Sequence, residues 1–503
     1  MFIKFASATV IGLNCVPVTV EVDIHKGQTN FNIVGLPDPS IKEAKDRLYA
    51  ALKNSDYSYP FNFRILVNLA PADTPKVGAI YDLAMAAGIV SLAEEIKLNL
   101  EETMIVGELS LDGQVRHVSG VLSLALYARE SGFIHFFVPE QDAPEAALVG
   151  ELTIYPVKNL RQLMNHLSGV EQIVPYTPET KILFSNEEYA ADLAYVKGQE
   201  FAKRALEIAA SGSHNILMSG PPGSGKTLLA RTLPSILPRL TNEEILEVTK
   251  IYSVAGLLES SYVSERPFRA PHHTASGVAL VGGGRIPRPG EISMAHRGVL
   301  FLDEFPEFPR FVIESLRQPL EDGIVTVSRA NGTWTFPARF ILVASQNPCP
   351  CGFKSDPTQP CVCSQSQLDR YQKKISGPLL DRIDLHVEVP RVQFEKLSTE
   401  NLAEGSAKVR ERVEAAREIQ NGRFKGKDVR TNSEMGNKEI KEFCKLDEAS
   451  IELLRGAVEK LHLSARGYNR VLKLSRTIAD LAGSQDIKIE HLAEALQFRA
   501  KAD

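Results

Sequence analysis

The first third of the chain alternates between two hydrophobic periods. Apolar and polar residues alternate in runs such as 18–22 and 63–68, which is the pattern of a strand with one buried face. Between such runs, residues 41–54 and 118–132 place apolar residues every three to four positions, as an amphipathic helix does. We therefore expect residues 1–170 to form a compact α+β domain.

The pattern then changes twice. Residues 171–192 contain two prolines and several acidic residues without periodicity, which is typical of a linker. The stretch 193–390 opens with a helix, a short apolar strand over 214–218, a glycine-rich turn and a further helix, the order in which a nucleotide-binding α/β unit begins. After residue 390 the strand signals fade, and we predict that 391–503 is an all-helical lid in which 433–461 is helical.

Composition and charge narrow the class of protein. The chain has 503 residues, of which 44% are hydrophobic and 24% charged, as in a globular α/β multidomain protein and unlike a disordered or low-complexity chain. Its formal net charge of −5 excludes a basic coat, so any contact with nucleic acid must be local. No apolar run reaches the ~18 residues of a membrane helix and the N-terminus lacks a signal-peptide pattern, so we expect a cytoplasmic protein without a membrane partner.

One motif indicates a phosphate site. It fits G-x-x-x-x-G-K-[ST] at every fixed position and lies between the strand and the helix that its mechanism requires. It consists of Gly220, Pro221, Pro222, Gly223, Ser224, Gly225, Lys226 and Thr227. Glycines let backbone N–H groups wrap phosphate oxygens at the positive end of the following helix. We expect Lys226 to reach the β- and γ-phosphates and Thr227 to ligate Mg²⁺.

Further polar residues follow apolar strands downstream. The strand 298–302 ends in Asp303, suited to Mg²⁺, and Glu304, suited to polarising an attacking water. The alternative interpretation is that both carboxylates are solvated surface groups, and the nearby phosphate motif argues against it. A third strand leads to Asn347, whose amide could sense the γ-phosphate. Arg382 lies between carboxylates, either as a local ion pair or as the arginine that completes a neighbouring subunit's site in ring ATPases.

Together these motifs resemble the AAA+ ATPases of the magnesium-chelatase clade. More closely, three stretches are similar to those of the ComM/YifB family, also called magnesium-chelatase-like proteins, and the resemblance covers essentially the whole chain. These stretches are Arg-Ala-Pro-His-His-Thr at 269–274, Gly-Gly-Gly at 282–284 and Pro-Gly-Glu-Ile at 289–292.

The resemblance implies an ATPase that uses ATP and Mg²⁺ and assembles into a homohexameric ring. It assigns Asn347 as sensor 1, Arg382 as the arginine finger acting on the neighbouring subunit, and Arg466 as sensor 2, with Arg470 as the fallback for that last role. Members look like ring translocases or helicases. The role that this implies is branch migration during uptake and recombination of transforming DNA.

The N-terminal domain carries a second resemblance, to the proteolytic domain of Lon. It rests on residues 68–78 and 107–113. By this likeness the nucleophilic serine of Lon falls at Lys76 and its lysine base at Leu122, so neither the hydroxyl nor the base of a Ser-Lys dyad is present. We expect a non-proteolytic scaffold of the ribosomal-protein S5 domain 2-like type.

Four of the six cysteines are crowded into one loop, 349–363. They are Cys349, Cys351, Cys361 and Cys363. Four thiolates can complete a tetrahedral Zn²⁺ shell and fold a loop that has little core of its own, although the C-x-C spacing is not the usual C-x₂-C. Free or redox-active thiols are the alternative. His272 and His273 are a weaker metal candidate, since contiguous side chains on an irregular loop seldom both ligate.

Two segments are candidates for DNA contact. Residues 324–336 have alternating β-branched residues around an Asn-Gly turn, which predicts a hairpin with Arg329 near its tip. The stretch 264–291 is locally basic and rich in glycine and proline. It contains Arg269, Arg285 and Arg288. A hairpin and an insert in the pore of a ring would contact the backbone of single-stranded or branched DNA independently of sequence. An ordinary surface hairpin and a solvated loop are the alternatives.

The leading hypothesis is therefore an ATP-driven hexameric motor on DNA. A magnesium-chelatase-type subunit that remodels a protein partner is the first alternative. The second alternative is an ATP-dependent protease or unfoldase. The missing Ser-Lys dyad argues against proteolytic activity.

Overall fold

The computed structural model describes residues 2–177, 191–284, 287–329, 332–354, 356, 359–392 and 403–499. The chain divides into two compact units. The first consists of Met1–Leu183, Asn242–Ser264 and Arg285–Arg288, and the second of Phe184–Thr241, Glu265–Gly284 and Pro289–Asp503. Most of the sequence-predicted linker 171–192 lies outside the described residues.

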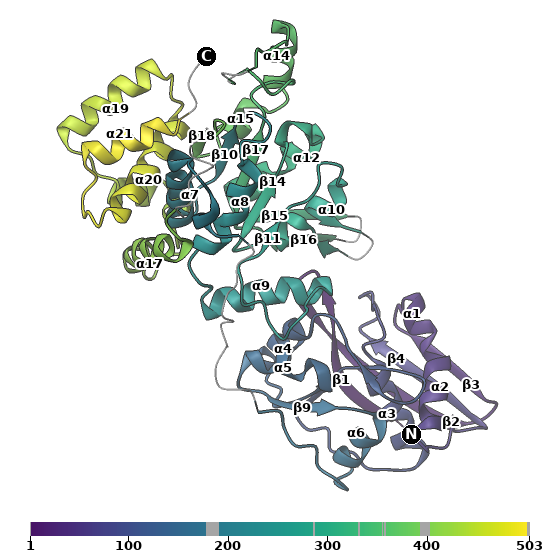
Figure 1. The fold of residues 1–503 in the computed structure, drawn as a ribbon. Coiled ribbons are helices and arrows are strands. Elements are labelled where there is room, and N and C mark those ends of the chain that lie inside the picture. The colour runs from purple at the N-terminus through teal and green to yellow at the C-terminus, as the bar shows by residue number, and fades with distance from the viewer. Residues whose placement is uncertain are drawn as a thin grey trace. The chain divides into compact units, whose positions relative to one another are not determined.

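A seven-stranded mixed sheet organises the first unit (Figure 1). Its order is β3-β4-β2-β1-β5-β8-β9, and the pairs of β2 with β1 and β4 are antiparallel whereas the others are parallel. The strands are β1 (Phe2–Ile11), β2 (Asn14–Lys26), β3 (Asn30–Val34), β4 (Phe63–Ala70), β5 (Thr103–Ile105), β8 (His135–Pro139) and β9 (Thr153–Val157), with a separate pair β6 (Glu108–Leu109) and β7 (Val115–Arg116). The helices are α1 (Pro39–Lys42), α2 (Ala44–Asn54), α3 (Asp82–Ala93), α4 (Val121–Glu130), α5 (Ala143–Ala146), α6 (Leu160–Leu167) and α9 (Asn242–Ala255).

Helix α3 forms the centre of this unit's core. Residues 82–91 are all buried, because the helix is apolar on every side and can be stable only inside the protein. It packs on β1 and β2, with Gly88 directly against Val22. Its N-terminal Asp82 is paired with Arg47, whose Nε lies 2.9 Å from Oδ2, yet burial raises the pKa of Asp82 to about 6.

Helix α9 follows the phosphate-binding segment in sequence but packs on α4 of the first unit. Ser253 donates a hydrogen bond of 2.5 Å to Glu145, which also accepts one of 2.7 Å from the backbone of Leu122. Burial of Glu145 raises its pKa to about 7. The sequence predicts one module over 193–390, which would include α9. In the structure α9 belongs to the first unit instead, where its Ser253 is buried.

A five-stranded parallel sheet organises the second unit (Figure 1). In spatial order its strands are β11 (Phe268–Arg269), β14 (Val299–Leu302), β17 (Ile341–Gln346), β10 (Ile216–Ser219) and β18 (Leu385–Glu388). The central strands are almost entirely apolar and buried, as a parallel sheet covered by helices requires. The helices that accompany this sheet are α7 (Glu200–Gly212), α8 (Lys226–Ile236), α10 (Gly277–Val281), α11 (Glu291–Met294), α12 (Arg310–Ser315), α13 (Arg317–Asp322), α14 (Gln365–Gln372) and α15 (Gly377–Leu380). Two further strand pairs are β12 (Gly282–Gly283) with β13 (Arg288–Pro289), and the hairpin of β15 (Ile324–Arg329) and β16 (Gly332–Pro337).

The C-terminal part of this unit is helical. Its helices are α17 (Ser406–Arg423), α18 (Asn437–Phe443), α19 (Glu448–Lys460), α20 (Ala465–Leu481) and α21 (Ile489–Gln497). The expected helix over 433–461 is interrupted between α18 and α19. Asp447 caps the start of α19 by accepting a hydrogen bond of 2.8 Å from the backbone of Ser450, and an aspartate at that position favours a new helix start over a continuous helix.

Buried polar contacts tie these helices to the sheet. His214, next to β10, lies 2.7 Å from the hydroxyl of Thr477 in α20 and 3.4 Å from the carboxylate of Asp384, next to β18. Arg470 of α20 lies 3.2 Å from the other oxygen of Asp384. Despite its complete burial, the pKa of Asp384 lies below its ordinary range, because Arg470, His214 and the backbone of Asn215 stabilise the carboxylate.

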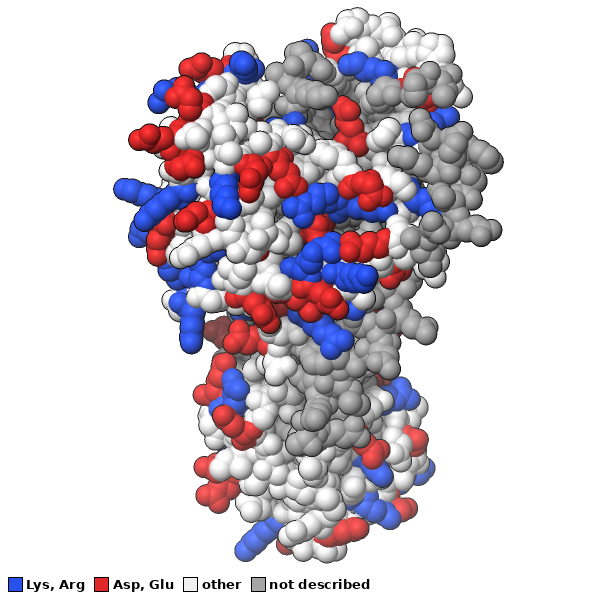
Figure 2. Space-filling model, turned by 60° about the vertical axis from the view of Figure 1, so that its left-hand side comes forward, with Lys and Arg blue, Asp and Glu red and all other residues white. Residues whose placement is uncertain are grey.

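The charge of the described surface is mixed. Figure 2 shows Lys and Arg side chains interspersed with Asp and Glu side chains over the face that it draws, consistent with the small net charge. Within the described residues, no helix is both long and apolar enough to cross a membrane.

The packing of α3 leads to a prediction. An added Cβ at Gly88 would lie 2.6 Å from Val22 Cγ2 and 3.0 Å from Phe5 Cε2. Gly88→Ala is therefore expected to destabilise the first unit by roughly 1–3 kcal/mol, even though alanine favours helix formation. Amide hydrogen exchange of residues 82–93 measures the effect. Gly27→Ala is the matched control, since nothing lies within 4 Å of its added Cβ. Equal protection of α3 in both variants would contradict this packing.

Candidate active site

Three neighbouring parallel strands end at the same edge of the second sheet. The phosphate-binding loop follows β10, Asp303 and Glu304 follow β14, and Asn347 follows β17. Lys226 Nζ lies 3.4 Å from Asn347 Oδ1, and Thr227 Oγ1 lies 2.9 Å from Asp303 Oδ2. The structure thus brings together residues that the sequence suggests from separate motifs.

The loop between β10 and α8 depends on its glycines. Gly223 and Gly225 have positive φ angles of 75° and 92°, and an added Cβ at Gly220 would lie 2.1 Å from the carbonyl oxygen of Val389. Lys226 donates hydrogen bonds of 2.7 and 2.9 Å to the carbonyls of Gly220 and Pro221. Its burial lowers its pKa, against the opposing charges of Asp303 and Glu304. The lysine is therefore held inside the loop that would wrap a phosphate.

The side chain of Ser224 in this loop indicates a ligand. The hydroxyl oxygen of Ser224 is buried and has no hydrogen-bond partner among the described residues. An unpartnered buried hydroxyl is costly, and a phosphate oxygen would supply its acceptor. Gln199, at the start of α7, donates hydrogen bonds to the carbonyls of Ser224 and Pro390 at 3.3 and 2.5 Å. The donor set of this loop fits a nucleotide phosphate.

Asp303 lies at the centre of the acidic part of the site. It accepts hydrogen bonds from Thr227, from the Ser345 hydroxyl and, at 3.1 Å, from the backbone of Glu304. The adjacent hydroxyl and carboxylate oxygens of Thr227 and Asp303 are hard ligands of the kind Mg²⁺ prefers. These two residues fit a magnesium ion bound beside the phosphates.

Glu304 is held differently from its neighbour. Its φ angle is 52°, in the left-handed region, and its side chain is 57% exposed, so that it is accessible to water. Its carboxylate lies 3.5 Å from Nδ1 of His273, whose ring packs edge-on to Phe308. The sequence suggests His273 as a possible metal ligand and does not predict this contact. No spacing rule joins the two residues, because they lie on different segments of the fold.

Arg382 and Arg466 meet at one carboxylate, that of Glu321 at the end of α13. Arg382 is buried. It donates a hydrogen bond of 2.7 Å to the carbonyl of Pro378 and forms an ion pair with Glu321. Arg466, at the start of α20, donates a hydrogen bond of 3.0 Å to the other carboxylate oxygen of Glu321. These arginines lower the pKa of Glu321, chiefly through the hydrogen bond from Arg382. Both arginines therefore pair with Glu321 of α13 within their own chain.

The candidate DNA-contact arginines have different surroundings. Arg329, at the end of β15, is exposed, and its guanidinium covers Gly283, so that an added Cβ there would lie 2.9 Å from Nη2. Arg269 instead forms a bidentate pair with Glu291, at 2.6 and 2.7 Å. Arg288 is exposed, and Arg285 lies outside the described residues.

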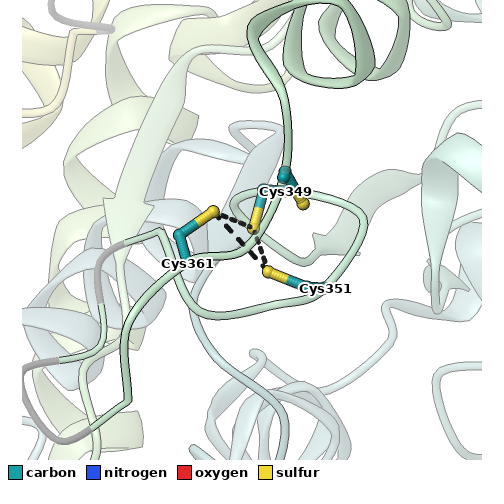
Figure 3. Close-up of side chains that lie close together, drawn as sticks. Cys349, Cys351 and Cys361 are labelled. Carbon is teal, nitrogen blue, oxygen red and sulfur yellow. Dashed lines mark hydrogen bonds between the residues drawn. The ribbon is translucent and has the colours of Figure 1, made fainter.

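The four clustered cysteines converge (Figure 3). The Sγ atoms of Cys349, Cys351 and Cys361 lie 3.3–3.7 Å apart, and all four, with Cys363, lie within 4.8 Å of one another. Hydrogen bonds from the backbone of Phe353 and Val362 lower the pKa of Cys351 to about 6. A tetrahedron with Zn–S bonds of about 2.3 Å has S···S edges of about 3.8 Å. The cluster therefore has the size of a single tetrathiolate metal site.

The positions that correspond to the Lon dyad are both buried. Lys76 donates a hydrogen bond to the carbonyl of Pro71, and burial lowers its pKa. Leu122 lies in α4 with a fully buried side chain. Neither position offers a hydroxyl nucleophile.

Comparison with known proteins agrees with this geometry. Three family models match the chain: "Magnesium chelatase, subunit ChlI" over residues 192–397, "Subunit ChlI of Mg-chelatase" over 20–142 and "Magnesium chelatase, subunit ChlI C-terminal" over 403–499. Together they span the nucleotide site, most of the N-terminal sheet and the helical C-terminal part.

Several relatives are similar over almost the full length. The chain is 46% identical to the competence protein ComM of Haemophilus influenzae, covering 97% of this chain and 96% of that one. It is 43% identical to the uncharacterized protein YifB of Escherichia coli, with coverage of 97% and 95%. The magnesium-chelatase 67 kDa subunit of Heliobacterium mobile is 26% identical over 40% of this chain and 33% of its own length. The chain therefore belongs to the ComM/YifB family of magnesium-chelatase-like AAA+ ATPases.

Proposed function

We propose that this protein is an ATP-driven homohexameric motor on DNA, a helicase or branch-migration factor in the recombination of incoming DNA during natural transformation. The observation that carries the proposal is the assembled site at the ends of β10, β14 and β17, in a chain whose relative is named a competence protein. A hydrolysis site of this kind supplies the energy for directed movement.

The residues of the site have distinct roles in hydrolysis. Lys226 exchanges the loop carbonyls for β- and γ-phosphate oxygens, and Ser224 and the backbone N–H groups of the loop bind the remaining oxygens. Thr227 and Asp303 would hold Mg²⁺, which neutralises phosphate charge when bound. Glu304 accepts a proton from the attacking water, and Asn347 orients the γ-phosphate from the side of Lys226.

Glu321 contacts both arginines that the family resemblance assigns to the ring. We assign Arg382 to the neighbouring subunit's nucleotide from that resemblance, and within this chain its guanidinium is paired with Glu321. Arg466 belongs to the helical lid and acts as sensor 2. Because Glu321 contacts both guanidinium groups, a movement of the lid and the position of Arg382 would be coupled through one carboxylate.

We assign DNA contact to exposed arginines, which would line the channel of the proposed ring. Arg329 and Arg288 are the leading residues, with Arg285 nearby in sequence, because Arg269 is already paired with Glu291. Repetition of a few arginines around the ring would supply a locally basic channel in a chain of net charge −5. Contacts of this kind bind backbone phosphates and are independent of sequence.

A second function is favoured by the family models, all of which describe a magnesium-chelatase subunit. In that case, the same ATPase would remodel a protein partner. ATP turnover discriminates the two: a DNA motor is stimulated by single-stranded or branched DNA, whereas a chelatase-type subunit is not.

The proposal includes three cofactors. ATP with Mg²⁺ belongs to the site at the strand ends, and one structural Zn²⁺ belongs to the cysteine cluster. The S···S distances of 3.3–3.7 Å support a single ion bound by thiolates.

Nucleotide chemistry can be tested at two residues of the site. Glu304→Gln is expected to lower kcat for ATP by about 10²–10⁴-fold while ATP still binds, because only proton transfer from water is lost. Lys226→Ala is expected to weaken binding as well, since phosphate charge is left unpaired. Turnover and binding of a fluorescent ATP analogue measure both. Glu452→Gln, an exposed residue of α19, is the control. Normal turnover in Glu304→Gln would contradict the assigned base.

The DNA assignment predicts a change in salt dependence. Alanine at Arg285, Arg288 and Arg329 should weaken DNA binding and reduce the slope of log K against log salt by about 0.7–0.9 for each phosphate that the variant no longer neutralises. Nucleotide affinity should stay unchanged. Arg455→Ala, on α19, controls for loss of charge alone. DNA affinity equal to that of the unsubstituted protein in the triple variant would exclude these residues from the channel.

The cysteine cluster predicts a metal content. Purified protein is expected to contain about one zinc per chain, and Cys361→Ser should lose it because a thiolate of the shell is removed. Cys444→Ser should keep it, since Cys444 is a buried cysteine outside the cluster. Elemental analysis that includes iron measures both. A zinc-free protein purified from zinc-supplemented medium would refute this site.

A further inference from the structure

We propose that the metal-binding segment 349–374 is a clamp on the nucleotide site, so that zinc retention and nucleotide binding strengthen each other. The inference rests on the zinc and ATP sites proposed above and goes beyond them. It makes the zinc a regulator of the ATPase site as well as a structural element of its own loop.

The segment cannot hold its position through a core of its own. Among its described residues only Cys349 and Gly352 are buried, and helix α14 buries none. Val362, between two of the thiols, is 82% exposed. Helix α14 has no buried face, so packing does not fix its position. The segment is anchored by the thiol cluster at its N-terminal side and by the ion pair of 2.9 Å between Asp356 and Arg391.

The first contact with the nucleotide site is a close approach between two loops. Gly352 lies between Cys351 and Cys361 in sequence and has a φ angle of 85°. An added Cβ would lie 2.6 Å from Cδ and 2.9 Å from Cγ of Pro222, a residue of the phosphate-binding loop. The backbone N–H of Gly352 donates a hydrogen bond of 3.0 Å to the carbonyl of Cys349, and this bond closes a tight turn. The turn that carries the thiols therefore packs directly on the loop that wraps phosphate.

The second contact reaches Asn347, two residues before Cys349. Burial raises the pKa of Tyr371 of α14 to about 12, and the nearby backbone of Asn347 opposes that rise. The side chain of Asn347 lies 3.4 Å from Lys226 Nζ. Asn347 therefore lies two residues before the cluster in sequence and close to Tyr371 of α14 in space. A shift of either would move its amide relative to the γ-phosphate.

The third contact reaches the turn after Glu304. Lys374 Nζ lies 2.8 and 2.9 Å from the two carboxylate oxygens of Glu307, which ends the short 3₁₀ helix Phe305–Glu307. Lys374 also lies over the ring of Tyr371, 5.5 Å from its centroid. The segment therefore contacts the phosphate-binding loop and the turn that follows Glu304, and it lies close to Asn347.

These contacts make the two binding events thermodynamically linked. If metal fixes the segment in the arrangement that favours nucleotide, nucleotide must favour metal by the same factor. Coupling of this kind between sites is typically about 5–150-fold. The reciprocal effect on zinc release is a signature that a purely structural zinc, folding only its own loop, would not give.

The experiment uses the full-length protein without DNA. Zinc release to a chromogenic chelator is measured with and without a non-hydrolysable ATP analogue, together with the affinity for a fluorescent ATP analogue. We expect the non-hydrolysable analogue to slow zinc release at least about fivefold. We expect Cys361→Ser to lose zinc and to bind nucleotide at least about fivefold more weakly, with circular dichroism close to that of the unsubstituted protein. Cys444→Ser should behave as the unsubstituted protein.

A second variant keeps the metal shell intact. Tyr371→Phe removes one hydroxyl close to Asn347 and no thiol, so it should retain one zinc while the effect of nucleotide on zinc release falls. Zinc release that is insensitive to nucleotide in the unsubstituted protein, or unchanged nucleotide affinity in zinc-free Cys361→Ser, would overturn the clamp. Both results are compatible with zinc binding and ATP turnover, so a failure of the clamp is distinct from a failure of the proposed motor.

Discussion

The parallel register of β10, β17 and β14 is the constraint on which the second unit depends. Ser219 pairs with Gln346 and Leu302 with Ala344, so the residues that follow each strand leave the sheet at one edge and at nearly one level. Backbone hydrogen bonds between buried strands oppose a slip of register, because a shift by one residue would exchange the side chains packed on the two covered faces and leave buried amides at the strand ends unpaired. Lys226 consequently meets Asn347 across more than a hundred residues of sequence.

Buried charge determines how the C-terminal helices meet this sheet. Asp384 stays ionised without solvent because His214 and Arg470 surround it, and Glu321 orders Arg382 and Arg466 in a similar way nearer the surface. Such pairs contribute little net stability, since desolvation cancels much of the attraction. They do specify geometry, because a displaced partner would leave a buried charge unpaired. Helix α20 is thereby fixed relative to β18.

The first unit shows how far local patterns extend. The alternation in β2 and β4 and the helical period of α2 are present in the sequence as patterns of spacing, and the structure has strands and a helix there. The packing of α9 on α4 is not predictable in this way, because periodicity shows that a helix has an apolar face but not what covers it. The break between α18 and α19 escapes a prediction from periodicity for a related reason: a single capping aspartate outweighs a continuous helical period.

Elements whose physics is local can be predicted from the residues alone. Glycines at fixed spacing before a lysine, carboxylates at the end of an apolar strand and thiols in pairs each carry their chemistry within a few residues, so strand, loop and ligand type follow from the sequence. Which of these groups meet depends on the packed fold. Sheet register and the path of the chain bring Glu304 to His273 and Gly352 to Pro222. These segments become neighbours only when the core is packed, so no local propensity encodes the distance between them.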